Sequence, residues 1–113
     1  MPTWDLERAL DNVDGDHTFL ADLIDTWLRV TPARLETLRV AFETGMMRDA
    51  AMTAHNLRGS AQVIAAVECE RTAGDIERIA DSESTEGWRA AYDHVVQSHG
   101  QLREHVSGWM ESR

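Results

Sequence analysis

Apolar side chains recur at intervals of three and four residues along almost the whole chain, the spacing that one face of an α-helix requires. Only two prolines and seven glycines interrupt the 113 residues, so the pattern runs on over long stretches. Apolar and polar residues show no sustained alternation, and the one Asp-Gly pair, Asp14-Gly15, joins two helical patterns rather than two strands. The sequence therefore predicts an all-α protein.

The N-terminal part of the chain divides at three interruptions. Thr3 is expected to cap a short first helix, and a turn at 12–15 separates it from a second helix that starts at Asp16 with Phe19 on its core-facing stripe. The pair Thr31-Pro32 then breaks the pattern. The stretch after this pair, which Gly45 ends, is either a separate helix or a kinked continuation of the second.

The rest of the chain contains three further helical patterns. Helices are expected at about 46–66, at about 67–81 and from Trp88 onward, after a polar break at 82–87 in which Ser84 or Thr85 caps the last helix. That helix repeats an apolar residue every seven positions, at Trp88, Val95, Leu102 and Trp109. Short connections favour antiparallel neighbours, so we expect residues 1–113 to form a single domain, an antiparallel four-helix bundle with an additional short N-terminal helix.

Composition excludes several classes of partner. The chain has 20 acidic residues against 11 basic ones, all arginine, and a net charge of −9, which repels the phosphate backbone of nucleic acids. No apolar run is long enough to span a membrane, and the N-terminus does not resemble a signal peptide. Because the single Cys69 cannot form an internal disulfide, we expect a cytoplasmic location.

Several familiar sites are excluded by spacing. The segment 12–16 lacks the terminal carboxylates of a calcium loop. His94, His99 and His105 are five and six residues apart, where two ligands on one helical face need three or four, so they are expected to be solvated or partly buried. The pair Gly59-Ser60 lacks the strand and second glycine of a nucleophile elbow, and Cys69 lies on an apolar stripe. We predict no metal site.

His55 differs because of its neighbours on the same helix. If Ala54 and Leu57 face the core, His55 points away from it, with Arg58 one turn on and Gly59 at the fourth position. A glycine inside a helix costs about 1 kcal/mol relative to alanine and brings no core packing on a solvated face. Something is therefore expected to approach the backbone there. The alternative is an ordinary surface histidine, with Gly59 present for helix packing.

These residue types suit a phosphate acceptor. A neutral imidazole nitrogen is a nucleophile toward phosphorus, and a nearby arginine can hold the negative charge of the phosphoimidazole. The segment 55–61, His-Asn-Leu-Arg-Gly-Ser-Ala, resembles the His-x-x-Lys-Gly-x-Ala/Ser signature of histidine-containing phosphotransfer (HPt) domains, the intermediates of multistep bacterial phosphorelays. The likeness covers about residues 4–80. Arg58 replaces the usual lysine, Ala65 stands where glycine is frequent, and Cys69 stands where a larger apolar residue is usual.

The resemblance implies a function and a role for each site residue. His55 would take a phosphoryl group from an aspartate of one receiver domain and pass it to an aspartate of another. Arg58 would stabilise the phosphoryl group, Gly59 would give access, and Gln62 would hydrogen-bond the imidazole or the phosphate. The chain would then be a phosphocarrier without autonomous catalysis and without a cofactor of its own, and the receiver domain would supply Mg²⁺.

The resemblance also implies partners, which are response-regulator receiver domains or a hybrid sensor kinase. Side chains around His55 are expected to form a modest transient interface, namely Arg48, Ala51, Met52, Asn56 and Val63. Met52 and Val63 could instead pack beneath neighbouring helices. We expect a monomer, although the seven-residue seam could continue into a dimer.

Two other functions are open. One is an interaction module that binds a receiver or kinase without being phosphorylated. The other is the phosphoacceptor bundle of a dimeric histidine kinase, which needs an ATP-binding domain for which 113 residues leave no room.

Overall fold

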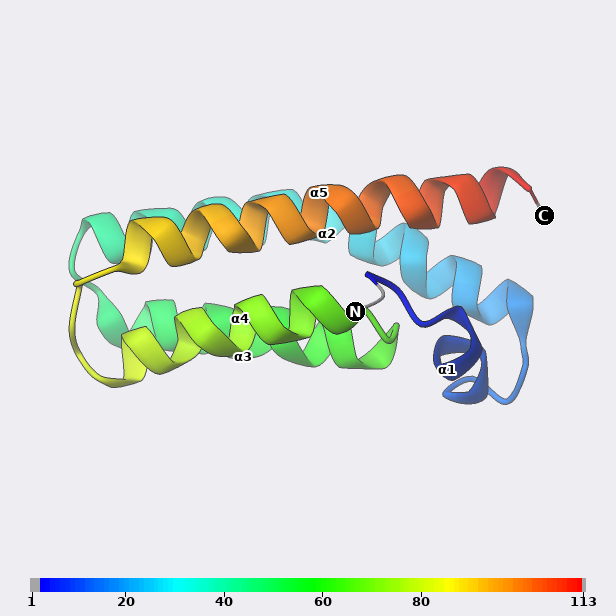
Figure 1. The fold of residues 1–113 in the computed structure, drawn as a ribbon, viewed down its shortest axis with the longest axis horizontal. Coiled ribbons are helices and arrows are strands. Elements are labelled where there is room, and N and C mark those ends of the chain that lie inside the picture. Colours follow the sequence, from blue (N-terminus) through cyan, green and yellow to red (C-terminus); the bar gives the residue numbers. More distant parts are fainter. Residues whose placement is uncertain (1–2, 113) are drawn as a thin grey trace.

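The computed structural model describes residues 3–112, which form five helices (Figure 1). A short helix precedes four long ones: α1 (Leu6–Asp11), α2 (His17–Glu43), α3 (Met47–Val63), α4 (Val67–Asp81) and α5 (Trp88–Glu111). Helices α2 and α5 lie along one side of the bundle and α3 and α4 along the other, while α1 packs at the end where α2 and α5 extend beyond the shorter pair (Figure 1). The predicted all-α four-helix bundle with a short N-terminal helix is confirmed.

Helix α2 runs without a break through Pro32, so the stretch after Thr31 is a continuation and not a separate helix. Proline has no backbone N–H and cannot bond the carbonyl four residues earlier. That carbonyl belongs to Leu28, and the Nη2 of Arg103 on α5 reaches it at 3.5 Å. Because the helix is continuous, residues on either side of Pro32 keep one helical phase along α2.

The capping predictions are partly wrong. The second helix was expected to start at Asp16, which is instead its N-cap, with its Oδ1 accepting from the N–H of Phe19 at 3.0 Å. Asp5, not Thr3, caps α1, because the helix begins later than expected and the Asp5 carboxylate lies within 3.0 Å of the Arg8 N–H. Phe19 is 51% exposed and does not face the core.

The loop before α5 also differs from the prediction. Neither Ser84 nor Thr85 caps this helix, since the N-cap residue is Gly87, whose φ of 80° is a left-handed conformation that favours glycine. The Ser84 hydroxyl accepts instead from the N–H of Glu86 within the loop, at 3.1 Å.

Helix α3 ends at Val63, three residues before the predicted end at 66, because Ala65 takes a left-handed φ of 58°. The carbonyls at this end lack partners within the helix. Donors from the N-terminal segment pair with these carbonyl oxygens and with those just beyond the helix. The Trp4 Nε1 donates to the Ile64 carbonyl (2.7 Å), the Asp5 N–H to the Ala65 carbonyl (3.1 Å) and the Asn12 Nδ2 to the Val63 carbonyl (3.2 Å). Residues 4–12 thus cap the end of α3.

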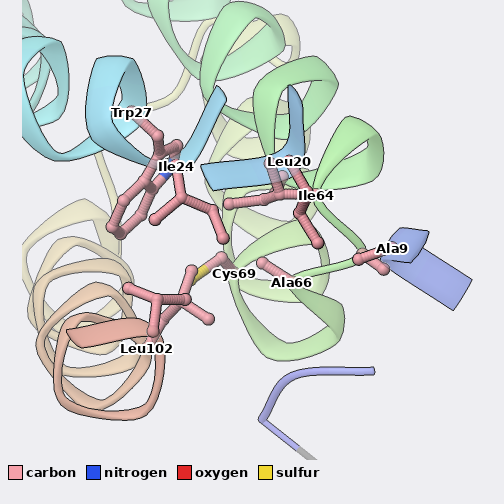
Figure 2. Close-up of a cluster of buried hydrophobic side chains, with 11 residues drawn as sticks. Ala9, Leu20, Ile24, Trp27, Ile64, Ala66, Cys69 and Leu102 are labelled. Atoms are coloured by element: carbon pink, nitrogen blue, oxygen red, sulfur yellow. The ribbon is translucent and has the colours of Figure 1, made fainter. Parts of the chain in front are cut away.

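Two clusters of buried side chains fill the bundle. The cluster near α1, drawn in Figure 2, joins α2, α3, α4 and α5 through Ile24, Trp27, Ala61, Cys69 and Leu102. The other cluster fills the opposite end and includes Leu38, Phe42, Leu57, Ile76 and Val95. Cys69 is buried as predicted, and burial raises the pKa of its thiol to about 12.

His99 is more deeply buried than predicted. His94 and His105 are exposed, but His99 is 3% exposed and its ring stacks on Trp27, with 5.6 Å between centroids and 11° between planes. A 2.8 Å contact joins its Nδ1 to the Val95 carbonyl oxygen, which allows the ring to be buried in its neutral form. Burial lowers the pKa of His99.

Candidate functional site

Helix α3 turns His55 outward by burying the opposite face. Ala54 and Ala61 are fully buried and Leu57 is 1% exposed, so these residues fix the rotation of the helix against the bundle. The His55 side chain is 63% exposed, as the apolar stripe predicts.

A carboxylate of α4 holds one side of the imidazole. Glu77, with a side chain only 15% exposed, places its Oε2 at 3.2 Å from His55 Nδ1. Its Oε1 lies 3.1 Å from the Nε of Arg58, so the carboxylate and the guanidinium form an ion pair. The sequence prediction did not include Glu77. The spacing in the sequence does point to Glu77, which is four residues after Ala73 and three before Ala80 and therefore shares a helix face with both. These two alanines are buried on the face that packs against α3.

The contacts around Nδ1 bear on which ring nitrogen carries the proton. Arg58 Nη2 also lies 3.1 Å from this nitrogen, but Nδ1 cannot donate to Glu77 and accept from Arg58 at the same time. A hydrogen bond from Nδ1–H to an ionised carboxylate is charge-assisted and is the stronger of the two. It leaves the lone pair on Nε2, for which no protein partner lies within hydrogen-bond distance in residues 3–112.

Arg58 and Gly59 differ in how tightly they are packed. The Cδ of Arg58 lies 3.7 Å from the point where a Cβ on Gly74 of α4 would stand, so its side chain runs across α4 next to a glycine. A Cβ on Gly59 would meet nothing within 4 Å. Packing against a neighbouring helix therefore does not explain Gly59, and the backbone beside His55 faces open space.

The other predicted residues lie around His55 with different partners. Arg48 and Asn56 are exposed and Ala51 is partly exposed. Met52 and Val63 are 59% and 49% exposed, so they do not pack beneath neighbouring helices. Gln62 does not contact the imidazole here, since its Nε2 donates to Glu70 Oε1 at 3.1 Å. Its contact with a phosphate stays a prediction, as does the interface role of the other residues.

Helix α2 shares this surface with α3, which the sequence prediction missed. One groove between the helices, of about 470 Å³, is lined by residues near Met52 that include Val40 and Met46, both exposed. A second, of about 240 Å³, lies beside Ser60 and Val63 and is walled on the α2 side by Leu23, Thr26, Trp27, Val30 and Arg34. The exposed apolar positions of α2 could not be separated from core positions by periodicity alone.

Residues 3–112 contain neither a metal-binding cluster nor a membrane-spanning helix. No three histidine, cysteine, aspartate or glutamate side chains lie close enough together in this range to hold a metal ion. Over the same residues, no helix combines the length and the apolar character needed to cross a membrane.

Comparisons with known proteins show the family to which the chain belongs. Among solved structures, the HPT domain from the Hpt sensor hybrid histidine kinase from Shewanella is similar in fold, with a TM-score of 0.85 over 98% of this chain and 96% of that chain at 13% sequence identity. No curated protein sequence matches. The family model described as Hpt domain matches residues 22–107, a range that contains His55 and Glu77. Since this match covers more than half of the sequence, the chain belongs to the Hpt domain family, the phosphotransfer modules of two-component signalling.

Proposed function

We propose that this Hpt domain is a phosphorelay intermediate in which His55 accepts a phosphoryl group from a receiver-domain aspartate and passes it to the aspartate of another receiver. The observation that carries the proposal is the asymmetry of the imidazole. Its Nδ1 is anchored 3.2 Å from Glu77, while the exposed ring and the open space over Gly59 leave Nε2 accessible to a partner.

The transfer needs no proton acceptor on this chain. The Nε2 lone pair attacks the phosphorus of the aspartyl phosphate, the N–P bond forms, and the P–O bond breaks to release the receiver carboxylate. The proton on Nδ1 stays in place and is held by Glu77. In the onward step a carboxylate oxygen of the second receiver attacks phosphorus, and the N–P bond returns its electron pair to Nε2.

Three neighbours support this chemistry. Glu77 positions the ring and stabilises the positive charge that develops on it when Nε2 bonds to phosphorus. Arg58, beside the ring, offers a guanidinium to the phosphoryl oxygens in place of the ammonium usual in the family. Gly59 leaves room for the receiver loops. Mg²⁺ and the remaining catalytic groups are expected from the receiver, so the chain acts as carrier and substrate rather than as an autonomous enzyme.

The proposed partners are receiver domains of response regulators or of a hybrid kinase. The exposed Met52 and Val63 offer apolar surface on either side of His55, within the set predicted from sequence. The protein is proposed to act as a monomer, because Trp88, Val95 and Leu102 of the seven-residue seam are buried inside the bundle and are not available to a second copy. The expected location is the cytoplasm.

The proposal is tested by mixing the protein with a receiver domain that carries a labelled phosphoryl group. Wild-type protein should acquire a label that is stable in base and labile in acid, as a phosphoimidazole is, and His55→Gln should acquire none. His105→Gln is a matched control, since it removes another exposed histidine from α5 and should label as wild type does. Binding of the receiver without labelling would favour the alternative of a non-phosphorylated interaction module.

A further inference from the structure

The methionines of residues 3–112 differ in how far solvent reaches them. Met46 and Met52 are 54% and 59% exposed, whereas Met47 and Met110 are partly buried against the two clusters of the core. A thioether is oxidised only where its sulfur atom can meet the oxidant, so exposure decides which methionine reacts first. Met46 and Met52 are therefore the methionines of this range most open to an oxidant from solution.

The thiol of Cys69 is protected from the same chemistry. Cys69 is buried, and burial raises the pKa of its thiol to about 12, so the group is neither accessible nor ionised at neutral pH. The thiolate is the form of cysteine that peroxides attack. Redox chemistry on the described part of this chain is therefore expected at methionine rather than at cysteine.

Met52 lies on the part of α3 that surrounds the phosphoacceptor. It precedes His55 by three residues, so the two side chains are neighbours on the helix surface. It precedes Gly59 by seven residues and so lies on the same stripe as the open backbone. Together with Met46, it also lines the groove of about 470 Å³. A partner that approaches His55 over Gly59 therefore meets the Met52 side chain.

We propose that Met52 is a modification site, at which a peroxide converts the thioether to the sulfoxide and thereby slows phosphoryl transfer to His55. The inference rests on the proposed function and adds a redox input to it. The sulfur lone pair attacks one oxygen of hydrogen peroxide, the S–O bond forms and the O–O bond breaks. The proton of the transferred hydroxyl joins the leaving hydroxide as water, so sulfur loses two electrons and the peroxide gains them.

The charges near Met52 favour an uncharged oxidant. Glu36 and Asp49 line the same groove, and the net charge of −9 repels anions, whereas hydrogen peroxide is neutral. The sulfoxide then replaces a flexible apolar side chain by a polar one. Covering a polar group without a hydrogen bond costs free energy, so the receiver should bind less well while the chemistry at Nε2 of His55 is unaffected.

The test oxidises this protein alone with hydrogen peroxide, removes the peroxide, and then measures transfer from an untreated phosphorylated receiver. Peptide mass spectrometry should show added oxygen at Met46 and Met52 before Met47 and Met110. Oxidation should lower the second-order rate constant about three- to tenfold and leave the rate constant at saturating receiver unchanged. Treatment with methionine sulfoxide reductase should restore the rate.

Three methionine-to-leucine variants, each compared with its own untreated sample, assign the effect. Met52→Leu should lose no activity on oxidation, because leucine is apolar and has no sulfur. Met46→Leu and Met110→Leu are matched controls that each remove another methionine, and both should lose as much as the wild type. Met52→Gln imitates the polarity of the sulfoxide, so it should transfer slowly before treatment and lose nothing further. Circular dichroism checks that each sample is folded.

A wild-type protein that carries the sulfoxide at Met52 and transfers at the untreated rate would overturn the inference. Equal losses on oxidation in Met52→Leu and the wild type would overturn it too, and so would protection by Met46→Leu instead of Met52→Leu. These results would leave the proposed function standing, because they concern only the oxidised protein. Absence of labelling in the untreated protein would contradict the proposed function as well.

Discussion

His55 and His99 are two histidines of one small bundle that have similar anchors and opposite surroundings. Each has an oxygen within 3.2 Å of Nδ1, from the Glu77 carboxylate for His55 and from the Val95 carbonyl for His99. The His55 side chain is 63% exposed on α3, whereas His99 is 3% exposed and stacks on Trp27 between α5 and α2. Anchoring one nitrogen thus does not make a phosphate acceptor, because the other nitrogen must also be open to a partner.

The two sites also differ in what surrounds the second nitrogen. The Nε2 of His99 is buried without a hydrogen-bond partner in residues 3–112, which only a neutral ring tolerates. The region of His55 instead offers Arg58 and an open backbone at Gly59. The region of His55 can therefore accommodate an incoming negative charge, whereas the region of His99 holds an uncharged ring.

Removal of the Glu77 anchor should have the largest effect on this contrast. Glu77→Ala is expected to slow phosphotransfer to His55 roughly ten- to hundredfold, since a hydrogen bond to a charged group contributes about 1.5–3 kcal/mol. Glu77→Gln should lose less, because its amide oxygen can still accept from Nδ1–H. The rates are measured by quenching the transfer reaction from a labelled receiver at successive times and counting the label on each protein. Equal rates in Glu77→Ala and wild type would mean that Glu77 does not position the ring.

Closing the space beside His55 should have the next largest effect. Gly59→Leu is expected to raise the free energy of unfolding by about 0.5–1 kcal/mol, because leucine favours a helix more than glycine does. The same change should slow transfer about tenfold or more by displacing the receiver from the acceptor nitrogen. Denaturant unfolding and transfer kinetics measured on one sample separate the two effects. A variant that is more stable and still transfers at the wild-type rate would remove the access argument.

The pH dependence of stability should show the smallest effect, and it concerns His99. Burial lowers the pKa of this histidine, so the unfolded chain binds its proton first as the pH falls. Its neutral form therefore gives full stability above about pH 6.5, and stability is lost below that by at most about 1.4 kcal/mol per pH unit until the folded protein also binds the proton. His99→Leu should flatten this loss in urea unfolding between pH 7 and pH 5. An unchanged slope in the variant would contradict the assignment.

The local parts of the site could be predicted from sequence, because they lie on one helix. The buried stripe of Ala54, Leu57 and Ala61 fixed the outward direction of His55 and brought Arg58 and Gly59 beside it. Helix periodicity likewise predicted the bundle and the range of α4. These features depend on neighbours within a few residues, which a linear sequence shows directly.

The contacts between helices could not be predicted in the same way. Glu77 is 22 positions from His55 and Arg34 is 26 from Ser60, so both pairs depend on the register between packed helices. The continuity of α2 through Pro32 was undecided for a related reason, since the Leu28 carbonyl that the proline leaves free finds its donor on α5. The burial of His99 depends on Trp27, another partner distant in sequence.

The position of the phosphoryl group on the imidazole tests the central claim most directly. The Glu77 contact assigns the proton to Nδ1 and the lone pair to Nε2, so ³¹P and ¹⁵N NMR of the phosphorylated, ¹⁵N-histidine-labelled protein should show a single N–P bond at Nε2 of His55. A phosphoryl group on Nδ1 of His55, or on any other residue, would contradict the account.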